Sequence, residues 1–316
     1  MLMSFPSPPD YLPSNHKKSY KLSFNTKFNS KMKFSLFSIA ALTSLSAVGA
    51  FRSSFTGAGR GSLVSDRCAA QSDTALCMKT IAVFGASGLT GAETVFQALN
   101  DGDNVVGLTR NPSNLKVPAG SGGASAGNPL ENPNLTMIAG DVTKKSDVDK
   151  VFENDVDGVV IALGGKTSEV GETMLTDGTN NIIAAMKEKG VKKVAVVTSI
   201  GAGDSENQAP FFFKVLMWTA MKKIFTDKNN QEEAVFNSGL DFCIVRPGGL
   251  TVDPPTGVIN VIDGEAGSIP RADVAQFCLD AIREEDFPYI GKAPCISSTG
   301  GTSWTKDRSK AARGEM

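Results

Sequence analysis

The chain has 316 residues, of which 41% are hydrophobic and 21% are charged, values typical of a globular protein. Its net charge is −1, but residues 1–70 hold nine of the 32 basic residues and only two of the 33 acidic ones, so residues 71–316 carry a formal charge of −8. Because binding nucleic acid through its phosphates needs a clustered basic surface, this balance argues against a nucleic-acid-binding protein.

The cysteines and the single histidine exclude further classes. Five scattered cysteines form no CxxC pair, and the only histidine is His16, so no metal site is predicted and no disulfide framework is indicated. Cys243 and Cys278 lie inside apolar runs, which predicts buried thiols.

Residues 1–72 have the composition of a targeting segment, expected to be disordered. An apolar stretch at about residues 32–50 ends in small residues, which is typical of a signal peptide, and residues 51–72 are rich in Ser, Gly, Ala and Arg, which is typical of a transit peptide. Together they resemble the bipartite leaders of algae with complex plastids, which implies import into the chloroplast; secretion and a cytoplasmic location are the alternatives. The apolar stretch is shorter than the ~20 residues of a membrane span, so the mature protein is expected to have none.

The pattern of the domain begins at Lys79. Residues 79–84 predict a buried strand, residues 85–91 have the spacing GxxGxxG, and a helical pattern continues through Leu99. This is the first unit of a dinucleotide-binding fold, because glycine lets the backbone approach a pyrophosphate and the helix N-terminus offers it free N–H groups. The candidate cofactor-binding residues in this turn are Gly85, Ser87, Gly88, Leu89, Thr90 and Gly91.

The second strand, residues 104–109, indicates which cofactor is bound. It is followed by Arg110, at the place where a site for NAD has an acidic residue that binds the ribose 2′-hydroxyl. A guanidinium suits the 2′-phosphate of NADP, so the sequence predicts NADP(H). A solvated arginine at the start of a loop is the alternative.

The remaining elements continue a βαβα order. Residues 118–133 predict a flexible surface loop, strands are expected at 135–138, 158–163 and 193–198, and a helix at 171–189. This order predicts a single α/β domain over residues 79–298, a Rossmann-like doubly wound parallel sheet, followed by a polar tail at 299–316. Asp141 is expected either to cap the next helix or to bind adenine. Val142, Leu163, Gly164 and Gly165 are further candidate cofactor contacts.

Several segments together resemble the atypical short-chain dehydrogenases/reductases with NmrA-like folds, close to the flavin reductase/biliverdin reductase B group. They are residues 85–91, 140–142, 176–191, 197–201, 238–250 and 269–275. The resemblance implies that Ser199 lies beside the nicotinamide and that residues 246–250 shape its pocket. Lys228 aligns with a histidine that faces the active site of that group, and an ordinary solvated lysine is the alternative. The residues that the resemblance adds are Thr198, Pro247, Gly248, Gly249 and Leu250 as cofactor contacts, and Ser199 and Lys228 as catalytic residues.

The missing residue types limit the chemistry. Tyr289 is the only tyrosine after the leader and lies in no YxxxK motif, and no histidine remains for a Ser-His-Asp triad. Reduction of a small planar conjugated acceptor (a flavin, quinone or bilin) by direct hydride transfer fits these limits. The alternative is a non-catalytic NADP(H)-binding redox sensor or assembly factor in the plastid, and the oligomeric state stays open.

The apolar run at residues 210–221 has three interpretations. It could cover an aromatic substrate, face a partner or a membrane, or pack into the core. Core packing is the favoured interpretation, because Trp and Met at helical spacing are usually buried.

Overall fold

The computed structural model describes residues 78–165, 172–264 and 266–298, so the expected targeting segment (1–72) and polar tail (299–316) lie outside the described residues. The strands are β1 (Thr80–Phe84), β2 (Asn104–Thr109), β3 (Leu135–Ala139), β4 (Gly158–Ile161), β5 (Lys193–Val197), β6 (Asp241–Pro247), β7 (Gly249–Thr251), β8 (Asn260–Val261), β9 (Ser268–Pro270) and β10 (Cys295–Ser297). The α-helices are α1 (Leu89–Asn100), α2 (Lys145–Val151), α4 (Met174–Lys189), α5 (Phe211–Trp218), α6 (Lys222–Phe236) and α7 (Arg271–Arg283). Three 3₁₀ turns are η1 (Pro112–Asn114), η2 (Gly123–Ser125) and η3 (Gly203–Gln208).

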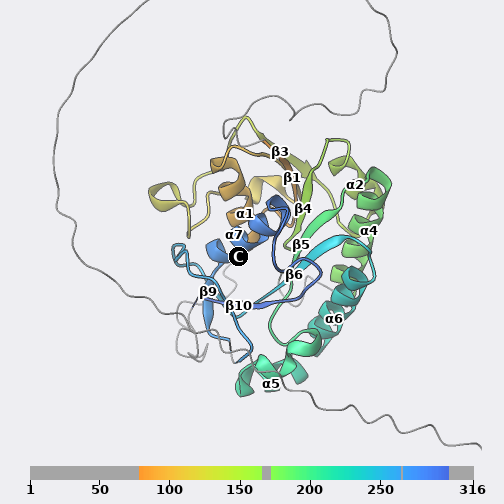
Figure 1. Ribbon diagram of the computed structural model, residues 1–316. Helices are drawn as coiled ribbons and strands as arrows, with labels where there is room; N and C mark the ends of the chain where they lie inside the picture. The colour runs from red at the N-terminus through yellow and green to blue at the C-terminus, as the bar shows by residue number, and fades with distance from the viewer. Residues whose placement is uncertain (1–77, 166–171, 265, 299–316) are drawn as a thin grey trace, which may run out of the picture. The chain divides into compact units, whose positions relative to one another are not determined.

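The main sheet has the strand order β3-β2-β1-β4-β5-β6-β10-β8 (Figure 1). Its neighbouring strands pair in parallel from β3 through β10, and β8 pairs antiparallel with β10. The chain runs outward from β1 to β3 and then returns to the other side of β1 with β4. This reversal places the topological switch point between β1 and β4, where doubly wound folds bind their ligands. The predicted Rossmann-like fold is confirmed.

Side chains of alternating direction bury both faces of the sheet. In β1, Ile81 and Val83 join the cluster formed with α1 and α7, whereas Ala82 and Phe84 join the cluster formed with α2, α4 and α6. Figure 1 shows these two groups of helices on opposite sides of the sheet. Successive residues of a strand point to opposite faces of the sheet, and each face is covered by a layer of helices. The strands therefore appear in the sequence as continuous apolar runs.

The element boundaries differ from the expectations by a few residues. β4 ends at Ile161, β5 ends at Val197, and α4 begins at Met174. Leu163 and Thr198 therefore follow their strands, at the carboxyl edge of the sheet where the chain turns.

The expectation of a flexible loop at residues 118–133 is wrong for its beginning. Pro118 and Gly120 are buried, and Glu93 Oε1 accepts hydrogen bonds from the backbone N–H groups of Gly120 at 2.9 Å and Ser121 at 3.3 Å. A buried carboxylate on α1 thus holds the segment in place. Local composition cannot reveal this contact, because its acceptor lies 27 residues earlier in the chain.

The favoured interpretation of residues 210–221, packing into the core, is wrong for one face of α5. Phe211, Phe212, Val215 and Trp218 are 70%, 73%, 42% and 57% exposed, whereas Met217 is buried. Phe213 packs its ring edge-to-face against Phe225 of α6. One face of this short helix therefore packs on the domain, and a second apolar face is exposed on the surface.

The predicted burial of the thiols is confirmed for Cys243 and Cys278, and Cys295 is also buried. Burial raises the pKa of the Cys243 thiol to about 12, which makes it a poor nucleophile. In the described ranges, no group of three or more His, Cys, Asp or Glu side chains is placed to hold a metal ion. No helix there is long and apolar enough to cross a membrane.

Candidate cofactor and active site

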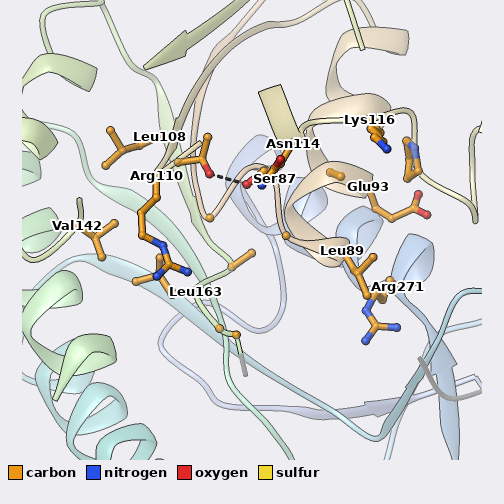
Figure 2. A pocket seen from close by; sticks show the side chains of 18 of the residues that line it. Ser87, Leu89, Glu93, Leu108, Arg110, Asn114, Lys116, Val142, Leu163 and Arg271 are labelled. Carbon is orange, nitrogen blue, oxygen red and sulfur yellow. Dashed lines mark hydrogen bonds between the residues drawn. The ribbon is translucent and has the colours of Figure 1, made fainter. Parts of the chain in front are cut away.

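A cavity of about 920 Å³ opens at the carboxyl ends of β1, β2, β3 and β4 (Figure 2). Its volume lies within the range of small-molecule and cofactor sites. The residues predicted as cofactor contacts that line it are Gly85, Ser87, Gly88, Leu89, Arg110, Asp141, Val142, Leu163, Gly164 and Gly165. Residues predicted from four separate parts of the sequence therefore meet in one place.

The glycine turn is built by close backbone packing. Gly85 has a φ of +81°, and a Cβ there would lie 2.5 Å from the carbonyl oxygen of Ala162, which follows β4. A Cβ on Gly91 would lie 2.1 Å from the oxygen of Gly85. Only glycine fits at either position, because the turn is pressed against both β4 and α1. Thr90 and Gly91 do not line the cavity, so Gly91 acts on the shape of the turn.

The N-terminus of α1 faces this cavity without a side-chain cap. Its N-cap residue is Gly88, which has no side chain to accept hydrogen bonds from the first turn. The N-terminus of α4 is different, because Asp227 of α6 accepts from the N–H groups of Leu175 at 2.8 Å and Thr176 at 3.0 Å. The unused N–H groups and the positive dipole end of α1 suit an anion such as a pyrophosphate.

The end of β2 supplies polar groups beside the turn. The hydroxyl groups of Ser87 and Thr109 form a hydrogen bond of 2.5 Å. Arg110 projects from the end of the strand into the cavity (Figure 2). Asn114 and Lys116, which were not predicted from the sequence, line the same cavity. Their signal was available as polar and basic residues four and six positions after Arg110.

Asp141 does not cap α2 directly. Its Oδ1 accepts from the N–H of Thr143 at 3.0 Å and from the Thr143 hydroxyl at 2.9 Å, which closes a turn before the helix. The N-cap position of α2 belongs to Lys144. The capping alternative is therefore wrong, and Asp141 stays beside Val142 in the cavity wall.

The predicted catalytic residues lie at the carboxyl end of β5, outside the lining of this cavity. Lys228 Nζ donates to the backbone oxygen of Thr198 at 3.3 Å, so α6 presents its lysine to the strand end that carries Ser199. The hydroxyl of Ser199 donates to the oxygen of Ile200 at 3.0 Å. Burial lowers the pKa of Lys228 to about 8, although the charges of Glu232 and Asp227 act in the opposite direction.

The segment 246–250, at the end of β6 and directly after it, includes a residue held by ion pairs and a glycine at a close backbone contact. The Arg246 guanidinium, which the resemblance assigned to the nicotinamide pocket, is bound by Glu232 and by Asp204. A Cβ on Gly248 would lie 2.0 Å from the oxygen of Gly267, so this glycine allows two backbones to touch. Pro247, Gly248, Gly249 and Leu250 do not line the cavity.

Two further charged residues of the cavity were not singled out from the sequence. Arg271 at the start of α7 and Glu93 of α1 both line it. Arg271 lies in the segment 269–275 that carries part of the family resemblance, but nothing local indicated its position beside the glycine turn.

Comparisons with known proteins agree with this geometry. Residues 85–285 match the family model described as NAD(P)H-binding. An uncharacterised chloroplast protein of Arabidopsis thaliana is 31% identical over 232 residues, which are 69% of this chain and 77% of that protein. A short-chain dehydrogenase/reductase of Veillonella parvula solved with NADP has a TM-score of 0.56 at 16% identity, covering 71% of this chain and 96% of its own. An anaerobilin reductase of Escherichia coli O157:H7 has a TM-score of 0.54 at 24% identity, covering 71% and 98%.

The solved structures confirm the fold. The family model confirms the predicted type of cofactor, a nicotinamide dinucleotide. The predicted resemblance is confirmed at the level of the NAD(P)H-binding family, and the solved reductases share the fold. The uncapped helix, the glycine turn and the polar end of β2 are the features such a dinucleotide needs. The chain belongs to the NAD(P)H-binding family of Rossmann-fold proteins.

Proposed function

We propose that the protein is an NADPH-dependent oxidoreductase that reduces a planar conjugated acceptor, a flavin, quinone or bilin, by direct hydride transfer. The observation that carries the proposal is the position of Lys228 at the end of β5. β4 and β5 are adjacent strands, so this lysine lies one strand away from Gly164 and Gly165, which line the dinucleotide cavity.

In this proposal the cavity residues hold the cofactor. The first turn of α1 binds the pyrophosphate, and Arg110 with Lys116 binds the 2′-phosphate. Asp141 and Val142 border the adenine. A Cβ on Gly164 would meet no atom of the described residues within 4 Å, so the backbone after β4 leaves room for close approach by the cofactor. The preference for NADP(H) over NAD(H) comes from Arg110 and Lys116, because their positive charges attract the 2′-phosphate that NAD(H) lacks.

NADPH, when bound, supplies a hydride from C4 of its nicotinamide. Ser199 donates a hydrogen bond to the acceptor or to the nicotinamide amide. Lys228 is cationic at neutral pH, stabilises the negative charge that the hydride brings to the acceptor, and donates one proton to it. The acceptor thus gains a hydride and a proton, and Lys228 recovers its proton from water.

The position of Tyr289 favours this chemistry over the reduction of ketones by a Tyr-Lys pair. Its ring packs against Phe277 and Phe287 with centroids 5.7 Å apart in both cases. Nearby, the N–H of Gly291 donates to the oxygen of Phe242 at the start of β6. Tyr289 therefore lies near the opposite edge of the sheet from the cofactor cavity.

A second candidate function is a non-catalytic NADP(H)-binding redox sensor or assembly factor. The exposed apolar face of α5, with Phe211, Phe212 and Trp218, favours it because such a face suits a partner protein.

Both candidates place the protein in the plastid. The leader composition and the chloroplast location in the name of the Arabidopsis relative support this location.

The test is NADPH oxidation by the purified protein, followed at the absorbance of the reduced cofactor with FMN, a quinone and biliverdin. We expect turnover with one acceptor, slower in Ser199→Ala and in Lys228→Met. Lys222→Met, an exposed lysine on the same helix, is the matched control and should keep the wild-type rate. Tight NADPH binding without turnover, together with a partner whose capture depends on the cofactor's redox state, would replace the reductase by the sensor.

A further inference from the structure

Helices α1 and α7 pack together on one face of the sheet (Figure 1). At their C-terminal ends, Arg283 of α7 binds Asp101 and Asp103, which follow α1, at 2.7 and 2.5 Å. The oxygen of Arg283 also accepts a hydrogen bond from Lys79, which precedes β1. Both helices therefore end at the amino edge of the sheet and begin at its carboxyl edge, beside the cofactor cavity.

Arg271 is the first residue of α7 and lines the cavity together with Leu89, the first residue of α1 (Figure 2). No side chain caps α7, as none caps α1. Two helix N-termini, each with the positive end of its dipole, are thus aimed at the same space, and a guanidinium stands at one of them.

The ion pairing of Arg271 differs from that of two other arginines of the domain. Arg246 and Arg283 each contact two carboxylates. Within the described ranges, Arg271 has no carboxylate oxygen within 4.0 Å, and the hydrogen bond it donates goes to the oxygen of Thr251 at 3.3 Å. Burial lowers the pKa of Arg271 to about 10, and the charge of Glu93 acts in the opposite direction. The half-buried Arg271 is therefore attracted by the charge of Glu93 but forms no direct ion pair with it.

Glu93 explains how this cation is kept in the cavity. Glu93 is 2% exposed, and its Oε1 accepts hydrogen bonds from the backbone N–H groups of Gly120 and Ser121. Its Oε2 is buried with no hydrogen-bond partner in the described part of the chain. The carboxylate is fixed to the 120–121 segment by one oxygen and attracts Arg271 with its remaining charge.

We infer that Arg271 binds the pyrophosphate of the dinucleotide, opposite the glycine turn, so that the phosphates lie between the N-termini of α1 and α7. The inference rests on the proposed NADP(H) site and adds a binding residue from the C-terminal part of the domain. Guanidinium groups suit phosphate oxygens because they donate two parallel hydrogen bonds. The position of Glu93 makes it a positioning residue for Arg271.

The experiment measures the affinity of the full chain for two ligands by calorimetry. NADPH has the pyrophosphate, whereas adenosine 2′-monophosphate has the adenine, the ribose and the 2′-phosphate but no 5′-phosphate. We expect Arg271→Gln to weaken NADPH binding about 10- to 100-fold, since it removes hydrogen bonds to a charged group, and to leave the binding of adenosine 2′-monophosphate unchanged. Arg283→Gln removes an arginine from the other end of the same helix and should leave both affinities unchanged.

Equal losses for both ligands in Arg271→Gln, or no loss for either, would overturn the inference. Arg271→Lys keeps a positive charge without the planar fork, and we expect an NADPH affinity between those of the wild type and Arg271→Gln. It also provides the test if the glutamine variant does not fold. A wild-type protein that binds NADPH tightly but reduces no acceptor would refute the proposed reductase and leave this inference standing.

Discussion

Glu232 and Arg246 form a buried ion pair behind the end of β5, with 2.6 Å between Glu232 Oε2 and Arg246 Nη2. The other oxygen of the same carboxylate accepts from Arg246 Nε at 3.1 Å and from the hydroxyl of Thr198 at 2.6 Å. The residue before Ser199 is therefore held by a charged group from α6, and α6 also carries Lys228.

Replacing Glu232 by alanine should destabilise the domain by about 3–5 kcal/mol, because it leaves the buried Arg246 guanidinium with the exposed Asp204 as its one carboxylate partner in the described residues. The free energy of unfolding in urea measures this loss. Glu172→Ala breaks the exposed pair with Lys223 and should cost much less, because water and salt screen an ion pair at the surface. Equal effects of the two substitutions would contradict a structural role for the buried pair.

The reduction rate should fall as the pH rises above about 8. Burial lowers the pKa of Lys228 to about 8, so the cation that stabilises the reduced acceptor is present below that pH and lost above it. Initial rates between pH 6 and pH 10, with saturating NADPH, test this. Lys228→Met should be slow and show no such step. A step of the same size and position in Lys228→Met would assign the titration to another group.

Arg110→Ala should weaken NADPH binding about tenfold or more and leave NADH binding nearly unchanged, because it removes hydrogen bonds to the 2′-phosphate only. Lys116→Ala should act in the same direction with a smaller effect, since an ammonium is a single point charge. Fluorescence titration with both cofactors provides the affinities. A parallel loss for NADPH and NADH would show that Arg110 supports the fold of the cavity and does not select the cofactor.

Two glycine substitutions should separate folding from cofactor binding. Gly164→Val should leave stability close to the wild type, because a Cβ at Gly164 meets no described atom within 4 Å. It should reduce NADPH affinity by filling the space beside the cofactor. Gly91→Ala should lower both, because its Cβ would meet the Gly85 oxygen at 2.1 Å. Thermal unfolding and NADPH titration measure the two effects. Full NADPH affinity in Gly164→Val would place the cofactor away from this glycine.

Local patterns were enough to predict the glycine turn and the end of β2. Gly85, Gly88 and Arg110 act through backbone conformation and through their position directly after a strand, and both are visible in a short window of sequence. The doubly wound parallel sheet followed from the βαβα alternation, because parallel strands with helical crossovers have few alternative arrangements.

Features that depend on tertiary packing could not be predicted in this way. Arg271 lines the cavity because α7 packs beside α1, and the ion pair between Arg246 and Glu232 joins β6 to α6. The outer face of α5 was misjudged because Phe211 and Trp218 have the same helical spacing whether a helix is covered on one face or on two.

The most direct test of the proposed function is single-turnover oxidation of NADPH that carries deuterium at C4, with the acceptor selected from FMN, a quinone and biliverdin. The bound cofactor should be oxidised in the presence of the acceptor, and deuterium at the transferred position should slow the reaction. Cofactor that stays reduced with every acceptor, or a rate that is the same with hydrogen and deuterium, would contradict direct hydride transfer by this protein.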